Sequence, residues 1–255
     1  MNKSSTSART RILSLVACTC LGAGAAGSET PELIRLIDSP TAGLIDKGRF
    51  GVDLRLFPRG GVLGQLNAGV LKRLGIGISF GGEEIIGDQT IDWYPRVEVA
   101  IRYRLIEETQ VWPAFVLGYE TQGFGTYRNK RYQIKSKGPF VALSKNYLST
   151  LGQFGVHGGL NLTREDGDED KDLSGWLGVD KSINEDLSLI AEYDLALNDD
   201  GISSLGSGEG YLNLGVRGAM APQLNIGFYL KNVLGNGRAD PDASRELAVL
   251  YTENF

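Results

Sequence analysis

The sequence has little or none of three features that would indicate a particular class of protein or site: cysteine beyond its first 20 residues, a long apolar run, and histidine. Cys18 and Cys20 are the two cysteines, and His157 is the single histidine. No stretch approaches the roughly 18 to 20 consecutive apolar residues that a transmembrane helix needs. A zinc site takes three or four ligands, so one histidine does not make one by itself. These absences argue against a helical membrane bundle and against a histidine-based metal centre.

The start of the chain has the pattern of an export signal, which we predict to span residues 1–26. Three basic residues come first, the apolar stretch Ile12–Leu21 follows, and the small residues Ala23–Gly27 suit a cleavage site. Cleavage after Ala25 or Ala26 would leave a mature chain without a thiol or a disulfide.

A lipoprotein signal is the alternative interpretation of this leader. Residues Leu15–Cys18 fit a lipoprotein cleavage box, in which Cys18 would be acylated. That cleavage would leave a very short apolar core, so ordinary signal cleavage is favoured.

Charge and composition limit the class of the mature protein. Removing the three basic leader residues would change the net charge from -5 to about -8. An acidic chain argues against a general nucleic-acid binder. The 35 glycines are spread through the sequence, which excludes a collagen-like or low-complexity chain. The remaining length, about 228 residues, suffices for one large all-β domain.

Apolar and polar residues alternate with a period of two along most of the mature sequence. Val52 and Leu54, for example, flank Asp53 and precede Arg55. Such alternation gives a strand one apolar and one polar face. Over residues 49–255 we therefore predict an all-β fold: a closed antiparallel up-and-down transmembrane β-barrel of about twelve strands. The predicted strands are 49–57, 61–70, 74–82, 95–105, 111–122, 138–147, 151–163, 173–182, 187–197, 210–218, 223–231 and 245–255.

The lengths of the connections support this topology independently. Short connections follow the even-numbered predicted strands, and longer ones rich in Gly, Asp and Asn follow most odd-numbered strands. The first outer turn, Pro58–Gly61, is the exception because it is tight. Alternating short and long connections are typical of the periplasmic and extracellular rims of a bacterial outer-membrane barrel. We therefore predict that the protein resides in the outer membrane.

Residues 27–48 precede the first predicted strand and show no clear period. They could form a periplasmic lead-in to the barrel. Alternatively they could form a plug inside it, because Leu33, Ile34, Leu36 and Ile37 would give such a plug apolar side chains to bury. Both interpretations remain open from the sequence.

Several short motifs resemble a known group of proteins. They are Leu36–Gly43, Gly60–Gly64, Trp93–Arg96, Ser136–Gly138 and Ala191–Asp194. This set resembles uncharacterised bacterial outer-membrane β-barrel proteins and is similar, more distantly, to the YjbH-like barrels associated with exopolysaccharide export. The resemblance covers residues 36–255 and implies the barrel fold and an export-associated role.

The carboxy terminus resembles the signal read by the barrel-assembly machinery. Tyr251 and the terminal Phe255 are the residues that carry this likeness, which implies that machinery as a partner. Glu253 departs from the pattern, because the third-from-last position usually holds an apolar residue.

The polar strand faces are expected to line the barrel interior. Buried charges must be paired or hydrated, because an isolated ion in a low dielectric is very costly. The charges could form an ion-pair network that fills a narrow lumen, or a pore wall that selects solutes. The predicted lumen-lining residues are Arg49, Asp53, Arg55, Arg96, Glu98, Arg102, Arg104, Glu120, Asp180, Glu192, Asp194, Arg217 and Lys231.

His157 is expected to point inward together with Asn161. Some outer-membrane barrels are hydrolases in which a histidine activates a serine. Here Gly158 and Gly159 follow the histidine, no serine lies two residues on, and such a dyad would have to face lipid. We therefore predict an interior histidine with a polar partner and assign no catalytic residue.

An acidic loop spans Glu165–Asp172. Asp166, Asp168 and Asp170 alternate along it and are a weak candidate for a hard cation such as calcium. The loop lacks the full calcium-loop pattern, so a solvated acidic loop is the favoured interpretation, with no metal and no cofactor.

A cationic loop carries Arg128, Lys130, Arg131, Lys135 and Lys137 on the presumed outer side. Lipopolysaccharide phosphates or an acidic glycan would suit these charges. A mobile, solvated hairpin is nevertheless the favoured interpretation of this loop.

The sequence as a whole favours a non-enzymatic outer-membrane barrel with a transport, export or surface role, for a small solute or a polysaccharide. Two alternatives stay open: a lipid- or glycan-modifying barrel enzyme that uses His157, and a sealed structural barrel. The expected partners are outer-membrane lipid, lipopolysaccharide and the assembly machinery, without nucleic acid. The sequence does not indicate an oligomeric state.

Overall fold

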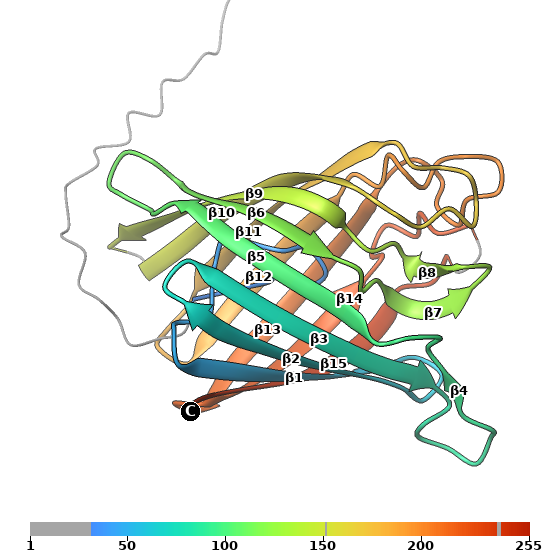
Figure 1. Cartoon of the computed structure of the whole chain (residues 1–255), viewed down its shortest axis with the longest axis horizontal. Coiled ribbons are helices and arrows are strands. Elements are labelled where there is room, and N and C mark those ends of the chain that lie inside the picture. The colour runs from blue at the N-terminus through green and yellow to red at the C-terminus, as the bar shows by residue number, and fades with distance from the viewer. Residues whose placement is uncertain (1–31, 151, 239–240) are drawn as a thin grey trace, which may run out of the picture.

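A closed antiparallel β-barrel is the main body of the computed structural model, which describes residues 32–150, 152–238 and 241–255 (Figure 1). The predicted signal peptide, residues 1–26, and Cys18 lie outside the described residues. Twelve strands of the described chain form the barrel: β1 (Arg49–Phe57), β2 (Gly61–Leu71), β3 (Leu74–Glu83), β5 (Glu98–Ile106), β6 (Ala114–Glu120), β9 (Gly138–Ser149), β10 (Gly152–Leu162), β11 (Leu173–Ser182), β12 (Leu187–Asp194), β13 (Tyr211–Ala221), β14 (Leu224–Lys231) and β15 (Ser244–Asn254).

Each barrel strand pairs with the one before and after it, and the β1–β15 pair closes the sheet. This closing ladder runs from Arg49 opposite Asn254 to Leu56 opposite Leu247. The short strand β4 (Asp92–Trp93) pairs antiparallel with the end of β3. Strand β7 (Phe124–Arg128) pairs with β8 (Arg131–Ile134) in a hairpin between β6 and β9. The predicted twelve-stranded closed barrel is therefore confirmed.

Four strand boundaries differ from the prediction by three residues. The ends predicted at residues 197 and 218 lie at Asp194 and Ala221, and two strands begin later than predicted. The strand predicted from residue 95 begins at Glu98, and the strand predicted from 111 begins at Ala114. Trp112 is two-thirds exposed in the turn before β6, so its apolar character reflects the membrane boundary rather than a strand. Alternation in the sequence alone does not distinguish an apolar residue at the membrane boundary from an apolar residue in a strand.

The outward face of the barrel is an apolar belt. Val52 and Leu54 on β1 and Ile76 and Ile78 on β3 are each between 38% and 52% exposed, although they are strand residues of the main sheet. A surface this apolar is the kind that lipid covers in an outer-membrane barrel. Within the described part of the chain, no helix is long and apolar enough to span a membrane.

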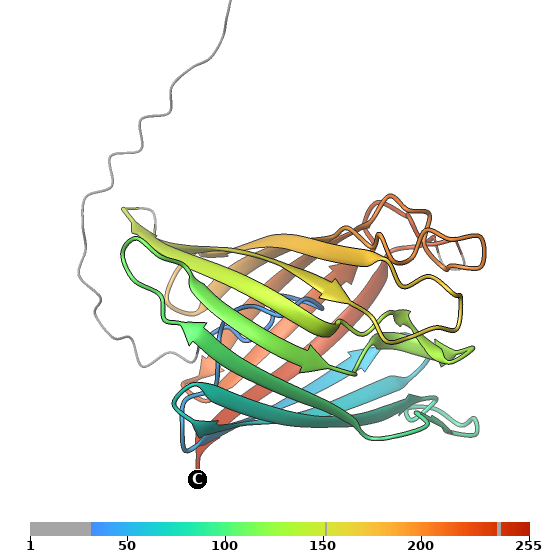
Figure 2. The ribbon, with the colours of Figure 1, turned by 45° about the horizontal axis from the view of Figure 1, so that its top comes forward.

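The two ends of the barrel differ. One end, here named the short-turn rim, carries the β2–β3, β11–β12 and β13–β14 turns and the carboxy terminus (Figure 1). The other end, the long-loop rim, carries β4, the β7–β8 hairpin and the longer connections between strands (Figures 1 and 2). Outer-membrane barrels place their short turns on the periplasmic side.

The amino-terminal segment lies inside the barrel (Figure 2). Residues 33–44, here named the plug, fold back on themselves: the Leu36 N–H donates to the Ser39 carbonyl at 2.9 Å. Leu36 and Ile37 are fully buried and pack in one core cluster with side chains of the barrel wall, among them Trp176. The segment therefore occupies the lumen and does not run alongside the barrel.

Candidate functional site in the plugged lumen

The plug is anchored to the wall by the carboxylate of Glu192 on β12. This carboxylate accepts the backbone N–H groups of Ile37 at 3.0 Å, Asp38 at 3.0 Å and Ser39 at 2.8 Å. The Asn213 side-chain amide also donates to it, at 2.9 Å. Hydrogen bonds to an ionised acceptor are stronger than neutral ones, so Glu192 holds the turn of the plug in a defined position.

A buried group of four charges lies beside that turn. Asp38 of the plug pairs with Arg55 at 2.7 Å and with Lys231 at 2.8 Å. Glu246 of β15 pairs with the same two cations, at 3.4 and 3.0 Å. All four side chains are nearly inaccessible to solvent, so two cations neutralise two carboxylates where an unpaired ion would be costly.

Wall donors also hold the carbonyl oxygens of the plug. Arg55 donates to Ile37 O at 2.6 Å, Arg217 to Leu36 O at 3.1 Å and Arg104 to Ala42 O at 2.9 Å. Two further wall side chains donate to plug carbonyls: Arg102 donates to Ile34 O, and the Trp176 indole donates to Pro40 O at 3.0 Å. A buried backbone needs such partners, and here the wall supplies them in place of a sheet.

The β7–β8 hairpin folds inward from the long-loop rim and reaches the plug. The ring of Phe124 lies 4.4 Å from the Arg55 guanidinium carbon and 5.3 Å from the Lys231 ammonium. Arg35 of the plug lies 5.1 Å from the same ring. Cations within about 6 Å of an aromatic face are attracted to it, so Phe124 connects the outer hairpin to the plug.

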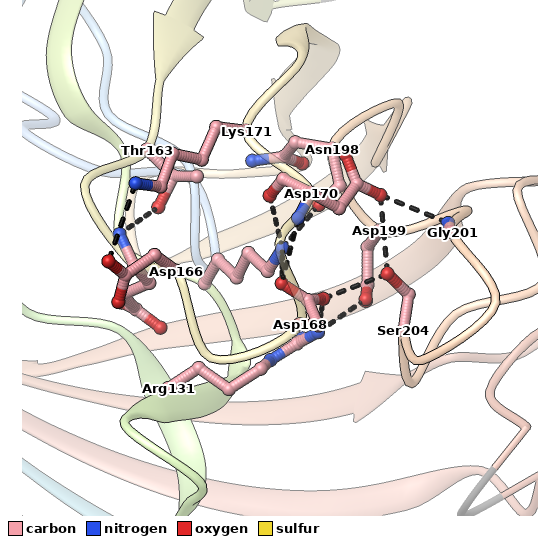
Figure 3. Close-up of polar contacts among 12 residues, drawn as sticks. Arg131, Thr163, Asp166, Asp168, Asp170, Lys171, Asn198, Asp199, Gly201 and Ser204 are labelled. Atoms are coloured by element: carbon pink, nitrogen blue, oxygen red, sulfur yellow. Dashed lines mark hydrogen bonds and ion pairs between the residues drawn. The ribbon is translucent and has the colours of Figure 1, made fainter.

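Three cations of the predicted cationic loop point inward, which corrects the expectation for that loop. Arg131 pairs with Asp168 and Asp199, at 2.5 and 2.6 Å, and Lys135 pairs with Asp168 at 2.7 Å (Figure 3). Lys137 pairs with Asp194 at 2.5 Å. Of the five residues, only Arg128 and Lys130 are exposed. Asp168 of the acidic loop neutralises Arg131 and Lys135, and Asp194 at the end of β12 neutralises Lys137. A count of charges in the sequence does not show such pairing.

The structure also changes the interpretation of the weak candidate cation site, which was Asp166, Asp168 and Asp170. Asp168 and Asp170 are buried among protein donors: Asp170 accepts the Asp200 and Gly201 N–H groups at 2.9 and 3.0 Å (Figure 3). Asp166 is exposed and pairs with Lys171 at 3.4 Å. Among the described residues, no group of three or more His, Cys, Asp or Glu could hold a metal ion. Lysine and arginine side chains, and not a calcium ion, are therefore the cationic partners of this acidic loop.

The Asp168 network is expected to weaken in acid. Burial favours the neutral carboxyl, but hydrogen bonds from Lys135 and Ser204 and the charge of Arg131 outweigh it and lower the Asp168 pKa below its ordinary 3.8. A lowered pKa contributes stability that is present above the unfolded value and lost as pH falls through the folded value. The outer loops should therefore stay closed above about pH 4 and loosen below it.

Pepsin cleavage of the outer loops, normalised to an unfolded substrate between about pH 2 and pH 5, measures this effect. Asp168→Asn is the control, since it has no charge to lose and should be cleaved over the whole range. Cleavage of the unmodified protein at a rate independent of pH would contradict the assignment.

The predicted lumen-lining residues fall into three groups. The buried residues are Arg55, Glu98, Arg102, Arg104, Glu120, Glu192, Asp194 and Lys231, whereas Arg49, Asp53, Asp180 and Arg217 are partly buried. Arg96 is the correction, because it lies in the connection before β5, is 58% exposed at its side chain and donates to Glu98 at 2.8 Å. The prediction began this strand too early, which moved Arg96 onto the inner face.

Some residues of the site were not predicted from the sequence. Asp38 and Arg35 belong to a segment without a period, so no parity rule assigns them a face. Glu246 could have been found, because it is opposite in parity to Leu247 and Val249 of the last strand. Glu246 is missing from the predicted lumen-lining residues because the alternation was not applied fully to the last strand.

His157 and Asn161 lie in the interior. Asn161 is buried and donates to the Lys137 carbonyl at 3.2 Å. His157 is 4% exposed and lies between Ser144, on the preceding strand, and Asp180, on the following one. Ser144 was missed because it is far from the histidine in sequence, though directly opposite it across the β9–β10 ladder.

The residues of the expected assembly signal lie at the short-turn rim. Tyr251 is 39% exposed on the outward face and Phe255 is 77% exposed, with each ring centroid 6.5 Å from that of Phe50. Recognition of these residues by the assembly machinery stays a prediction.

Comparison with known proteins gives a fold but no family. No protein-family model matches the sequence, and no curated protein matches it. Among solved structures, the chain is similar to a KdgM porin in complex with disordered oligogalacturonate, with a TM-score of 0.52 and 8% identity over 80% of this chain and 98% of that chain. The fold is that of an outer-membrane porin barrel.

Two further porins are similar at lower scores. A KdgM porin has a TM-score of 0.49 with 7% identity, covering 80% of this chain and 98% of that chain. A NanC porin has a TM-score of 0.46 with 12% identity, covering 81% and 99%. These comparisons give no support to the likeness with YjbH-like barrels, which rested on short motifs that do not identify a family.

Proposed function

We propose that the chain is an outer-membrane channel for small anionic solutes, closed here by its own plug. The observation that carries this proposal is the set of wall groups that hold the plug. Arg55, Arg102, Arg104, Arg217 and Lys231 all direct donors at oxygen atoms of the plug. The plug therefore occupies these cations in the way that an anionic ligand would.

Displacing the plug would remove one acceptor from each of these cations and free part of its hydrogen-bonding capacity. Each cation would keep a partner outside the plug: Glu246 for Arg55 and Lys231, Glu120 for Arg102, Glu107 for Arg104 and the Tyr229 hydroxyl for Arg217. Arginine binds carboxylates in a bidentate manner, which suits recognition of a sugar acid or another small carboxylate. The similar KdgM porin was solved with an oligogalacturonate, and we extend that class of solute to this chain as part of the proposal.

Export of an exopolysaccharide, which the YjbH likeness implied, is not retained, because the comparisons lend it no support. A twelve-stranded barrel also leaves much less lumen than barrels of sixteen or more strands. Small solutes and short oligosaccharides therefore fit the proposal better than a long polymer.

Recordings in planar bilayers test the proposal. A chain lacking residues 33–44 should carry current, and its reversal potential in a salt gradient should show a preference for anions because of the exposed cations. Replacing Arg102 and Arg104 with Gln should reduce that preference. Arg245→Gln, which removes an exposed charge of β15, is the matched control and should leave it unchanged.

A sealed structural barrel is the second candidate. It is favoured by one observation, that the outer hairpin and the plug fill the lumen together and meet at Phe124. If the chain without its plug inserts into bilayers but carries no current at any voltage, this candidate replaces the channel.

A further inference from the structure

Three side chains on adjacent strands form a hydrogen-bonded series on the inner wall. The Oγ of Ser144 on β9 lies 2.7 Å from Nδ1 of His157 on β10. Nε2 of the same imidazole lies 2.7 Å from Oδ1 of Asp180 on β11. Serine, histidine and aspartate in this order are the groups of a nucleophile, a general base and the carboxylate that orients the base.

The plug determines how the protons are arranged in this series. The Ala42 N–H donates to the Ser144 Oγ at 2.8 Å, so that oxygen accepts and its own hydrogen is free to donate. The Asp180 carboxylate only accepts, so Nε2 of His157 donates to it. With its proton on Nε2, the imidazole presents the Nδ1 lone pair to the serine hydroxyl, which is the arrangement that a general base needs.

Gly155 provides the space for the histidine–aspartate contact. A Cβ atom at this position would collide with Asp180 Oδ1 and with His157 Nε2. Gly155 lies directly opposite Asp180 in the β10–β11 ladder, on the same inner face as His157. An alanine here would therefore disturb the orientation of the imidazole without altering any of the three reacting side chains.

Ala42 of the plug covers the serine, and a cation lies close by. While its N–H contacts Ser144, its carbonyl accepts from the Arg104 guanidinium at 2.9 Å. Once the plug has left, a ligand group that takes the position of Ala42 would contact both the serine hydroxyl and the arginine. A guanidinium there could stabilise the oxyanion that forms when an acyl carbonyl is attacked.

We infer that Ser144, His157 and Asp180 form a hydrolytic site for small carboxylic esters, such as O-acyl groups on a solute, covered by the plug. Ser144 Oγ bonds to the ester carbonyl carbon, and its proton passes to His157 Nδ1. The bond to the alkoxy oxygen then breaks, and His157 returns the proton to the leaving alcohol. Water hydrolyses the acyl-serine by the same route, so ester and water give acid and alcohol.

This inference rests on the proposed displacement of the plug. Asp180 is the third residue from the end of β11, close to the short-turn rim, and its side chain is 19% exposed. A small ester therefore has its shortest approach from that rim once residues 41–44 move. The lipid-facing dyad considered from the sequence is excluded for these residues, because Ser144 and His157 are buried inside the barrel.

Covalent labelling tests the site directly. The chain lacking residues 33–44 is treated with a fluorophosphonate probe, and the adduct is located by mass spectrometry. We expect modification at Ser144, at a rate about 100-fold above that of the intact chain, because the plug covers the hydroxyl. Ser174→Ala, which removes another buried inward serine of the wall, is the matched control and should leave labelling unchanged.

Hydrolysis of p-nitrophenyl acetate by the chain without its plug separates the roles. His157→Ala should abolish turnover, whereas Asp180→Asn and Gly155→Ala should lower it and shift its pH profile, because both act through the imidazole. A chain that carries current but forms no Ser144 adduct overturns this inference alone. A chain that does neither overturns the channel as well, and an adduct without current supports the site but not the channel.

Discussion

Replacing Glu192 with alanine should convert a closed barrel into a conducting one. Glu192 alone accepts three backbone N–H groups of the plug turn, at 2.8 to 3.0 Å. Hydrogen bonds to a charged group contribute about 1.5 to 3 kcal/mol each. Even a combined loss of about 4 kcal/mol would shift the equilibrium between seated and released plug by about a thousandfold.

Single-channel recording gives the open probability of the purified protein in bilayers. Glu192→Gln is the control, since it keeps an acceptor oxygen without the charge, and we expect an intermediate open probability. If Glu192→Ala stays as silent as the intact protein while the chain without residues 33–44 conducts, the plug is held mainly by its arginine contacts. In that case the Glu192 assignment is wrong.

Replacing Arg55 with alanine should be the most destabilising single change in the lumen. Its guanidinium contacts Asp38, Glu246 and the carbonyl of Ile37, so the variant would leave two buried carboxylates to Lys231 alone. Removing one partner of a buried ion pair costs about 3 to 5 kcal/mol, because the other charge remains buried. We expect the free energy of unfolding to fall by an amount in this range.

Urea unfolding in lipid vesicles measures this effect, with loss of heat-modifiable migration as a second readout. Asp38→Ala in the Arg55→Ala background should restore part of the stability, because one stranded carboxylate is removed. Equal effects of the single and double variants would show that Arg55 acts through packing against Phe124 and not through its charge.

The strands were predictable because a barrel in lipid repeats one simple rule. Each strand needs an apolar outer face and a polar inner face, so parity alone assigns Val52 outward and Arg55 inward. The rule fails at the ends of strands, where Trp112 lies in an exposed turn and Arg96 lies in the connection before β5. At those positions the membrane boundary, and not the sheet, decides which residues are apolar.

The partners of the lumen residues were not predictable in the same way. Parity places Arg55, Glu192 and Lys231 inside, but it does not show that their partner is a non-periodic segment about 150 residues away from Glu192. The prediction for the cationic loop was wrong for a related reason. Lys135 and Asp168 are 33 residues apart, and their pairing depends on two loops folding toward each other.

The position of Phe124 links the behaviour of the two ends of the barrel. Its ring contacts Arg35 of the plug as well as Arg55 and Lys231 of the wall, while its backbone belongs to the outer hairpin. Coupling between two sites is reciprocal in free energy. If withdrawal of the hairpin toward the cell exterior weakens the hold on the plug by some free energy, release of the plug toward the periplasm weakens the hold on the hairpin by the same amount.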